Sequence, residues 1–581
     1  MKSFMTWLRK HQILWILLIA LVILIPRGLD LERFVTTDET PWLMRSANFY
    51  YALGQREFER TNQGINPGVT TMWVNTAAFL WKAPEYRGLG QGYFEEYIDF
   101  DKFMLEKGLD THAILVGGRT IMLIENTILL LIAFLIAIRL FGLYPALAGF
   151  LLIAFDPFHI SLTLVSHMDG QLGNLMLVSL LAFLAYLYDQ PRLIYIVISA
   201  LAAGLACLTK LPAYLLFPVL GLVVFITAIN VWRKTFKQDK RQFQTWMGRL
   251  IRHLSVWAII FAGVYVILWP AMWVDPVGNF VNQVSGPFMF SDRGNLIDSM
   301  VEVDPAESMV ATAGSTLQKL AFYPKWYLWL ETPVVLIGVL VALVAFYKKV
   351  PPFDEKNRRN IAFALIIFAI IYTLGIGYID KHNPRYMIPA VIVLILLAAL
   401  GWVAVIGQLN KLKKLKLKYL AISLLMAVIV YFQLGGVIQT YPYYYSYFDP
   451  LMGGSRVAGK TLFIGSGEGL DEAGRYLSNK PGAEDLTVLS WYGSGCFSYY
   501  FSGTTIIIPT GITNNDYIAR NLVKADYLVT YTNQWHRRIP PELFDILDQI
   551  EPEHTIWINN IEYANIYAVS ELPPEVFVYQ K

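Results

Sequence analysis

Charged residues are scarce in this sequence. Asp, Glu, Lys and Arg make up 16% of the 581 residues, whereas a soluble globular protein usually carries about 25%. Hydrophobic residues make up 55% of the chain. This composition excludes an ordinary soluble protein, and the net charge of +3 is too small to indicate a nucleic acid partner.

Cysteine is nearly absent. Cys207 lies in an apolar run and Cys496 lies far away in the polar tail. Two such distant cysteines predict neither a disulfide framework nor a zinc site. The first apolar run lacks a small-residue cleavage site, so we interpret it as a membrane span and not as a cleaved signal peptide.

Long apolar runs take the place of the missing charge. Many of them approach the length of about 20 residues that a helix needs to cross about 30 Å of hydrocarbon. We therefore predict a polytopic α-helical membrane protein with about eleven transmembrane helices. The predicted spans are 11–26, 113–138, 143–158, 171–188, 192–209, 211–230, 254–272, 326–347, 361–378, 386–408 and 419–438.

Basic residues gather in particular loops between the spans. The segment 231–253 has seven Lys and Arg residues against one acid, and 411–418 has five lysines and no acid. Loops rich in Lys and Arg face the cytoplasm. We therefore predict a multi-pass protein of the cell membrane with a cytoplasmic N-terminus. The loops 27–112 and 273–325 and the C-terminal tail should then lie on the outer side.

The tail changes character after about residue 440. Strand-length apolar stretches alternate with helix-like stretches, which predicts a small extracytoplasmic α/β domain over 441–581, beside a membrane domain over 1–440. The predicted strands are 486–491, 504–509 and 527–531, and the predicted helices are 469–477 and 541–550.

Two features connect the membrane part to the tail. The run 441–448 is rich in tyrosine, which favours the membrane interface, where the ring is half buried and the hydroxyl is wet. The glycine-rich turn 465–469 follows a predicted short strand, 461–464, and precedes a helix. A lone glycine pattern is weak evidence for a nucleotide site, so we interpret it as a tight structural turn.

An adjacent acidic pair, Asp38 and Glu39, follows the first span closely and should lie near the outer surface. A carboxylate there could act as a general base. Alternatively, the pair could mark the start of a helix, with Thr37 or Asp38 as the cap. Partial burial beside Trp42 and Phe34 would raise the pKa of Asp38 and make it a stronger base.

A second group of ionisable residues lies around the fourth predicted span. Asp169 opens this span, next to His167. Ionisable groups near membrane depth are costly and usually have a partner or a function. The alternative is that Asp169 only caps a helix whose start is wet. With Asp156 and His159, the region has groups that bind divalent cations, but their scattered spacing does not predict a metal.

Several basic residues lie on the predicted outer side, where the positive-inside bias disfavours them. An anionic ligand, most simply a phosphate, would explain them, and snorkelling to lipid headgroups is the alternative. We favour phosphate binding for Arg385 and leave both interpretations open for Arg119 and Lys210. The predicted phosphate and donor contacts are Arg385, Lys381, Arg119, Lys210 and His167.

Taken in order, these features resemble the C-type (GT-C) membrane glycosyltransferases, most closely the protein O-mannosyltransferase-like glycosyltransferase family 39. The similar features are the pair Asp38–Glu39 after the first span, Arg119 near the start of the second and Asp169 opening the fourth. Arg385 adds to them, in the Pro-Arg-Tyr-x-x-Pro motif that opens a late span. The resemblance implies a GT-C-like fold and sugar transfer from a polyprenyl-phosphate donor to a hydroxyl of a protein or glycolipid acceptor, without a cofactor.

The resemblance also implies roles for the residues. The first acid of the pair, here Asp38, would be the catalytic base, and Glu39 and Asp169 would position the acceptor or Asp38. Arg385, with Lys381 and Arg119, would hold the phosphate, and the anomeric carbon would be inverted. The alternative function is a transporter or flippase of lipid-linked sugars. Such proteins often contain inverted repeats and broken helices, and the sequence shows neither.

Overall fold

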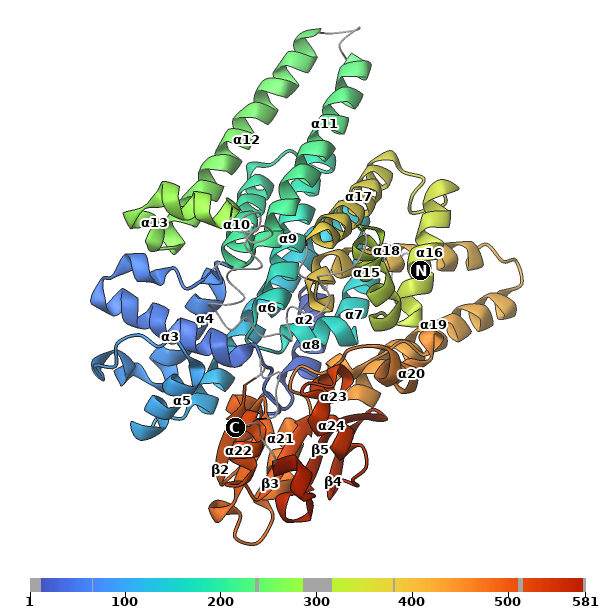
Figure 1. Ribbon diagram of the computed structural model, residues 1–581. Coiled ribbons are helices and arrows are strands. Elements are labelled where there is room, and N and C mark those ends of the chain that lie inside the picture. The colour runs from blue at the N-terminus through green and yellow to red at the C-terminus, as the bar shows by residue number, and fades with distance from the viewer. Residues whose placement is uncertain are drawn as a thin grey trace.

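The computed structural model describes residues 12–64, 66–235, 240–285, 316–379, 382–509 and 516–577. A bundle of apolar helices carries a small domain with a β-sheet at one end (Figure 1). We call this end of the bundle the domain end. The polytopic α-helical fold with a C-terminal α/β domain, which the sequence predicts, is confirmed.

Helix length and apolar composition agree with the hydropathy analysis. Two shorter apolar helices, α2 (Gln12–Gly28) and α10 (Leu193–Thr209), coincide with predicted spans. In the described ranges, seven helices are long and apolar enough to cross a membrane. They are α6 (Thr111–Phe141), α9 (Met168–Tyr188), α11 (Leu216–Thr235, preceded by η3, Leu211–Leu215), α12 (Lys240–Leu268), α17 (Lys356–Tyr378), α18 (Ile388–Leu409, preceded by η4, Pro384–Met387) and α19 (Leu415–Thr440).

Two of the predicted spans, 143–158 and 326–347, are broken helices, although the sequence analysis found no sign of broken helices. Helices α7 (Leu143–Ala154) and α8 (Pro157–Thr163) meet at 67°, and α15 (Thr316–Leu330) and α16 (Pro333–Tyr347) meet at 119°. In both pairs the second helix begins with a proline, which forces the preceding residue, Asp156 or Thr332, into an extended conformation. The side chain of that residue then caps the new helix.

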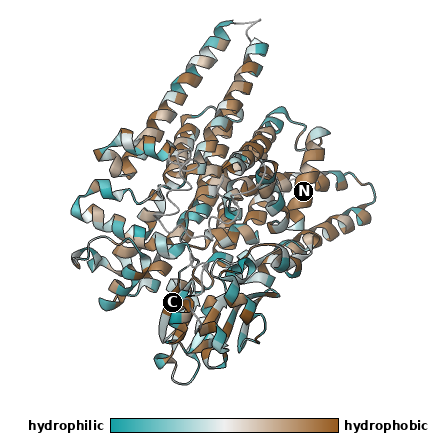
Figure 2. Ribbon diagram, in the orientation of Figure 1, coloured by the Kyte–Doolittle hydropathy of each residue, from teal (hydrophilic) through white to brown (hydrophobic). Residues whose placement is uncertain are grey.

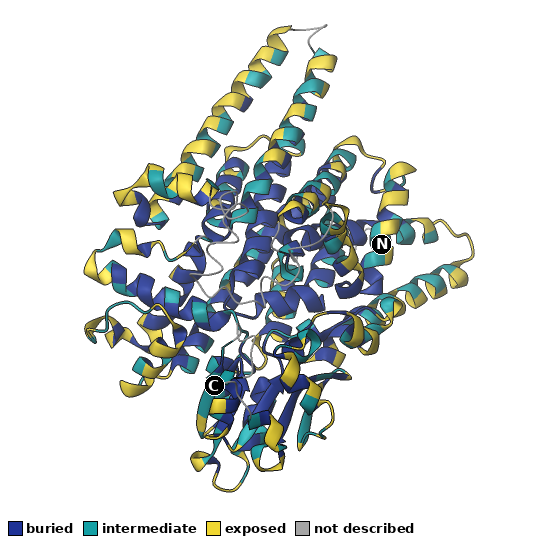
Figure 3. Cartoon of the chain, viewed as in Figure 1, coloured by how far each residue is buried: buried dark blue, intermediate teal, exposed yellow. Residues whose placement is uncertain are grey.

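Helix α9 lies at the centre of the bundle, while α12 lies at its edge (Figure 3). Of the most apolar stretch of each helix, 94% is buried in α9 and 11% in α12. The exposed residues of α12 include large apolar side chains such as Ile259 and Ile267, and Figure 2 shows this apolar colouring along the helix. An apolar helix with much of its surface uncovered by protein fits a lipid-facing position.

Basic residues occupy the end of the bundle away from the C-terminal domain. There α11 and α12 extend past the other helices (Figure 1), and the last turn of α11 carries Arg233 and Lys234 while α12 begins with Lys240 and Arg241. The distribution agrees with the predicted topology. The side of the membrane on which each end lies stays a prediction.

The C-terminal domain contains a five-stranded sheet in the order β2-β1-β3-β5-β4. The three predicted strands are present as β1 (Thr487–Trp491), β2 (Thr504–Ile508) and β3 (Tyr527–Tyr531), and they are parallel. The sequence analysis missed the antiparallel hairpin of β4 (His554–Ile558) and β5 (Ile561–Ala568). Its signal is Asn559-Asn560, two adjacent residues with positive φ in a two-residue turn.

Helices flank the sheet, among them α20 (Gly454–Thr461), α21 (Leu470–Ser478), α22 (Asp516–Leu522) and α24 (Pro541–Leu547). The predicted strand 461–464 is wrong, because α20 continues to Thr461 and the following residues pair with no strand. The tyrosine run 441–448 also differs from expectation. Tyr443 and Tyr444 are buried, and their hydroxyls donate to Asp471 and to the carbonyl of Pro26, so they join the bundle to the domain instead of facing water.

Candidate functional site

Asp38 lies at the start of α3 (Glu39–Gln55), but it does not cap this helix. Its carboxylate accepts no hydrogen bond from the helix N–H groups. Instead, both carboxylate oxygens contact the guanidinium of Arg385, with Nη2 3.2 Å from Oδ1 and Nη1 against Oδ2. The helix-cap alternative therefore does not account for the side chain of Asp38, whose position is set by a residue 347 positions away.

Arg385 joins Asp38 to a second carboxylate. The residue lies in the short helix η4, where the Asn383 side chain accepts a hydrogen bond from the Arg385 backbone N–H. The Nε of Arg385 lies 3.2 Å from Oδ2 of Asp169. One planar guanidinium thus contacts two carboxylates, a geometry that lysine cannot reproduce.

Asp169 is fully buried in the first turn of α9 and is not a wet helix cap. The Nζ of Lys210 lies 2.6 Å from its Oδ1, and the Nδ1 of His167 lies 3.2 Å from its Oδ2. Lys210 follows the last residue of α10, and its ammonium lies 4.0 Å from the ring centre of Tyr386. The structure therefore brings together Asp38, Asp169, His167, Lys210 and Arg385, which we call the charged cluster.

The negative charges of the carboxylates in the charged cluster equal the positive charges of Arg385 and Lys210. Asp38 and Asp169 carry two negative charges, and Arg385 and Lys210 carry two positive charges. Asp38 and Arg385 are the more exposed pair, at 17% and 12% of their side-chain surface, whereas Lys210 and Asp169 are enclosed. A ligand from solution would therefore meet the Asp38–Arg385 pair first.

The electrostatics of Asp38 differ from our expectation. Burial acts to raise its pKa, but the charges of Arg385 and then His167 outweigh burial and hold the pKa well below its ordinary value. The rise in pKa expected from burial beside Trp42 and Phe34 is therefore wrong for this arrangement. While it is paired with Arg385, Asp38 is ionised but a weak base.

Glu39 and Arg119 form a separate, fully buried pair next to the cluster. Arg119 donates from Nε to Glu39 at 2.7 Å and from Nη2 at 2.5 Å, and its other N–H groups donate to the carbonyls of Leu31, Arg33 and Phe34. All five guanidinium N–H groups are used in this way. Arg119 thus holds Glu39 and the backbone before Asp38 in this structure, and its placement among the phosphate contacts stays a prediction.

This assignment of Arg119 predicts a loss of stability on substitution. Arg119→Met leaves the Glu39 carboxylate buried without its cation. Such a change typically lowers the free energy of unfolding by about 3–5 kcal/mol. Thermal unfolding in detergent should show a clear drop in Tm, and adding Glu39→Gln should recover part of it. A raised donor KM with an unchanged Tm would instead support phosphate binding by Arg119.

The remaining predicted residues divide into two groups. Lys381 lies outside the described residues. His159 is buried between Arg27 and Asn174, and Asp156 caps α8, so neither belongs to the charged cluster. Among the residues that the structure describes, no group of three or more His, Cys, Asp or Glu side chains is arranged to hold a metal ion.

Sequence reasoning missed two aromatic residues at the cluster. Tyr386 places its ring against Lys210. Tyr445, from the tyrosine run, also lies close by: burial raises the pKa of its hydroxyl, and the charge of Arg385 opposes that rise. The run itself was visible in the sequence, but nothing there distinguishes Tyr445 from its neighbours.

An apolar cavity of about 400 Å³ begins beside the charged cluster. It lies between α15, α16, α17 and α18, and its lining contains almost no polar atoms. Met387, two residues after Arg385, lines it near the domain end, and Phe353, which follows α16, lines it toward the opposite end. Between them lie Ile370, Val391 and Leu394.

No protein-family model and no curated protein matches the sequence. Among solved structures, the fold is similar to apo ArnT from Cupriavidus metallidurans, with a TM-score of 0.46, 14% identity and coverage of 98% of this chain and 100% of that one. A structure of the same ArnT bound to undecaprenyl phosphate gives a TM-score of 0.46 and 14% identity, with 97% and 99% covered. The archaeal oligosaccharyltransferase AglB from Archaeoglobus fulgidus gives a TM-score of 0.46 and 13% identity, with 91% and 70% covered.

Proposed function

We propose that this chain transfers a sugar from a polyprenyl-phosphate donor to an acceptor hydroxyl, of a protein or a glycolipid, at the outer face of the membrane. The observation that supports it is the charged cluster at one end of the apolar cavity. The cavity suits an isoprenoid chain, which must stay out of water. Arg385 and Lys210 suit the phosphate, and Asp38 suits the acceptor hydroxyl.

The chemistry is a direct displacement. Asp38 takes the proton of the acceptor hydroxyl as its oxygen forms a bond to the anomeric carbon. The bond from that carbon to the phosphate oxygen breaks on the opposite face, which inverts the configuration, and polyprenyl phosphate leaves with the electron pair. Arg385, supported by Lys210, stabilises the negative charge that develops on the leaving phosphate.

The charge balance of the cluster gives donor binding a second role. Without a donor, the carboxylates of Asp38 and Asp169 already occupy the guanidinium of Arg385. The donor phosphate must compete with Asp38 for this guanidinium. When it wins, Asp38 loses the charge that lowers its pKa and becomes a stronger base. The base is thus strengthened only when a donor is in place.

A transporter or flippase of lipid-linked sugars is the second candidate, and the two broken helix pairs favour it. Buried carboxylates lie at both breaks, Asp156 in one and Glu331 in the other, as in many transport sites. However, α8 packs against η5 (Tyr444–Ser446) and the Trp329 carbonyl accepts a hydrogen bond from the Asp449 backbone N–H. The breaks therefore lie toward the domain end and not near the midplane, where transporters place the sites that their broken helices form.

The two candidates differ in what happens to the donor. Purified protein in vesicles is incubated with a panel of labelled undecaprenyl-phosphate hexoses and pentoses, together with membranes of the source cells as acceptor. We expect release of undecaprenyl phosphate in step with sugar on the acceptor. Movement of intact donor between leaflets without such release would contradict the proposal and support the transporter.

A further inference from the structure

The loop that carries Asp38, residues 29–38, lies between the bundle and the C-terminal domain. We call it the acidic loop. On the bundle side, Arg119 holds its backbone through the carbonyls of Leu31, Arg33 and Phe34. These three bonds come from one buried guanidinium, so this side of the loop is fixed by the membrane part of the chain.

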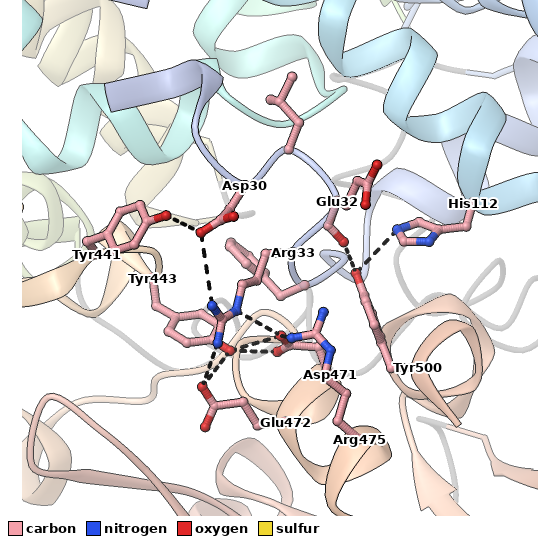
Figure 4. Close-up of polar contacts among 12 residues, drawn as sticks. Asp30, Glu32, Arg33, His112, Tyr441, Tyr443, Asp471, Glu472, Arg475 and Tyr500 are labelled. Carbon is pink, nitrogen blue, oxygen red and sulfur yellow. Dashed lines mark hydrogen bonds and ion pairs between the residues drawn. The ribbon is translucent and has the colours of Figure 1, made fainter. Parts of the chain in front are cut away.

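The C-terminal domain holds the same loop from the other side. The Thr37 backbone N–H donates to the Ser466 carbonyl at 3.0 Å, directly before Asp38. The Tyr500 hydroxyl donates to the Glu32 carbonyl at 2.8 Å. Figure 4 shows Tyr500 and Glu32 together with Arg33, whose guanidinium lies 3.5 Å from Glu472 and 3.7 Å from Asp471.

Gly467 lies closely against the backbone of the acidic loop. A Cβ atom at this position would lie 2.4 Å from the Val35 carbonyl oxygen and 3.4 Å from Cα of Thr36. Its φ of +112° is a conformation that residues with a side chain rarely adopt. Glycine is therefore required here by both the contact and the backbone conformation.

The turn that presents Gly467 is itself held by buried groups. The Gly467 N–H donates to the Tyr531 hydroxyl at 2.8 Å, and the Ser466 N–H donates to Glu468 at 2.7 Å. Tyr531 is the last residue of strand β3, so the turn is tied to the centre of the sheet. The glycine-rich turn is thus structural, as the sequence predicts, but it acts on the acidic loop.

We infer that the C-terminal domain positions the catalytic base through Gly467, Ser466 and Tyr500, which clamp the acidic loop against Arg119. These three are positioning residues, because they contact the loop backbone and not the reacting groups. The inference rests on the proposed function and adds to it a role for the domain in turnover. This role differs from that of a domain that only binds the acceptor.

The expected effect is on turnover, because a misplacement of about 1 Å in a reacting group can cost about 100-fold in rate. Loosening the clamp moves Asp38 relative to the acceptor hydroxyl and to Arg385. The kcat should therefore fall, while the KM for the donor changes little. The pKa that governs the acid limb of kcat against pH should also shift, because the charges that face Asp38 are Arg385, His167 and Asp169.

Two variants, each with a matched control, test the clamp. Tyr500→Phe removes the hydroxyl that bonds to the Glu32 carbonyl and lies 3.4 Å from His112 Nε2, but keeps the ring that Arg475 lies over. Its control, Tyr517→Phe, removes an equivalent hydroxyl-to-carbonyl bond within the domain. Gly467→Ala inserts a methyl group against Val35, and its control, Gly482→Ala, has a positive φ of +71° but open space around it.

In sugar-transfer assays we expect kcat to fall about threefold to tenfold for Tyr500→Phe and about tenfold to 100-fold for Gly467→Ala. Both controls should keep the wild-type kcat, and the Tm of Tyr500→Phe should match that of Tyr517→Phe. Wild-type kcat in folded Tyr500→Phe and Gly467→Ala would overturn the inference, as would a rise in acceptor KM alone. If Gly467→Ala does not fold, Tyr500→Phe decides. Failure of the proposed function would look different, because the wild-type protein itself would then transfer no sugar.

Discussion

Asp38→Asn should fold, insert and bind the donor, yet transfer sugar at least about 100-fold more slowly, because loss of a general base typically costs about 10²–10⁴ in rate. The structure sharpens this expectation. The Asp38 carboxylate caps no helix, so the substitution removes basicity without removing a cap. It also weakens the hold on Arg385, so donor binding should stay as strong as in the wild type or become tighter. Single-turnover transfer and equilibrium binding of labelled donor measure the two effects separately.

Glu39→Gln is the matched comparison, since it makes the same change in the neighbouring residue. Glu39 is buried against Arg119 and accepts backbone N–H bonds from Thr36 and Ser166, so its loss should lower Tm and affect turnover less than Asp38→Asn. Near-normal turnover in Asp38→Asn would contradict the assignment and move the search to Asp169. That residue is enclosed by Lys210, His167 and Arg385, and it therefore has less access to an acceptor.

The helical part of the fold could be predicted because hydropathy is a local property of each segment. A long apolar run in lipid has to form a helix to satisfy its own backbone. The breaks before Pro157 and Pro333 were missed because a continuous apolar run outweighed the proline signal in the hydropathy analysis. In the tail, the parallel strands were predicted from their apolar runs. The β4–β5 hairpin was not predicted because its strands mix apolar with polar residues, so that only the turn Asn559-Asn560 marks it.

Part of the site could be predicted because sidedness and order along the chain limit which charges can meet. This reasoning selected Asp38, Asp169 and Arg385, and the structure brings them together. It could not show that Arg119 pairs with Glu39 and with three backbone carbonyls, because the partners of a buried guanidinium depend on how distant segments fold together. It also missed the lowered pKa of Asp38, since burial was visible in the sequence pattern but the pairing with Arg385 was not.

Arg385→Ala should weaken donor binding strongly and acceptor binding little. A hydrogen bond to a charged group contributes about 1.5–3 kcal/mol, so the donor Kd should rise by about 10- to 100-fold. The carboxylates of Asp38 and Asp169 lose their shared cation and repel the phosphate, so the rise in donor Kd should lie toward the upper end of this range. Arg385→Lys should restore only part of the affinity, because an ammonium cannot contact two carboxylates or a phosphate in the bidentate way of a guanidinium. Wild-type donor affinity in both variants would show that Arg385 does not bind the phosphate.

The pH dependence tests whether the donor takes Arg385 away from Asp38. The acid limb of kcat/KM reports the free enzyme, in which Arg385 lowers the pKa of Asp38, and the acid limb of kcat reports the enzyme with bound substrates. If the phosphate displaces Asp38, the pKa of the base is higher in the complex, so the acid limb of kcat should lie at higher pH than that of kcat/KM. In Arg385→Ala the pKa of Asp38 is no longer lowered in the free enzyme either. The acid limb of kcat/KM should therefore move to higher pH, toward that of kcat. Limbs that coincide in the wild type would mean that Asp38 and the donor phosphate do not compete for Arg385.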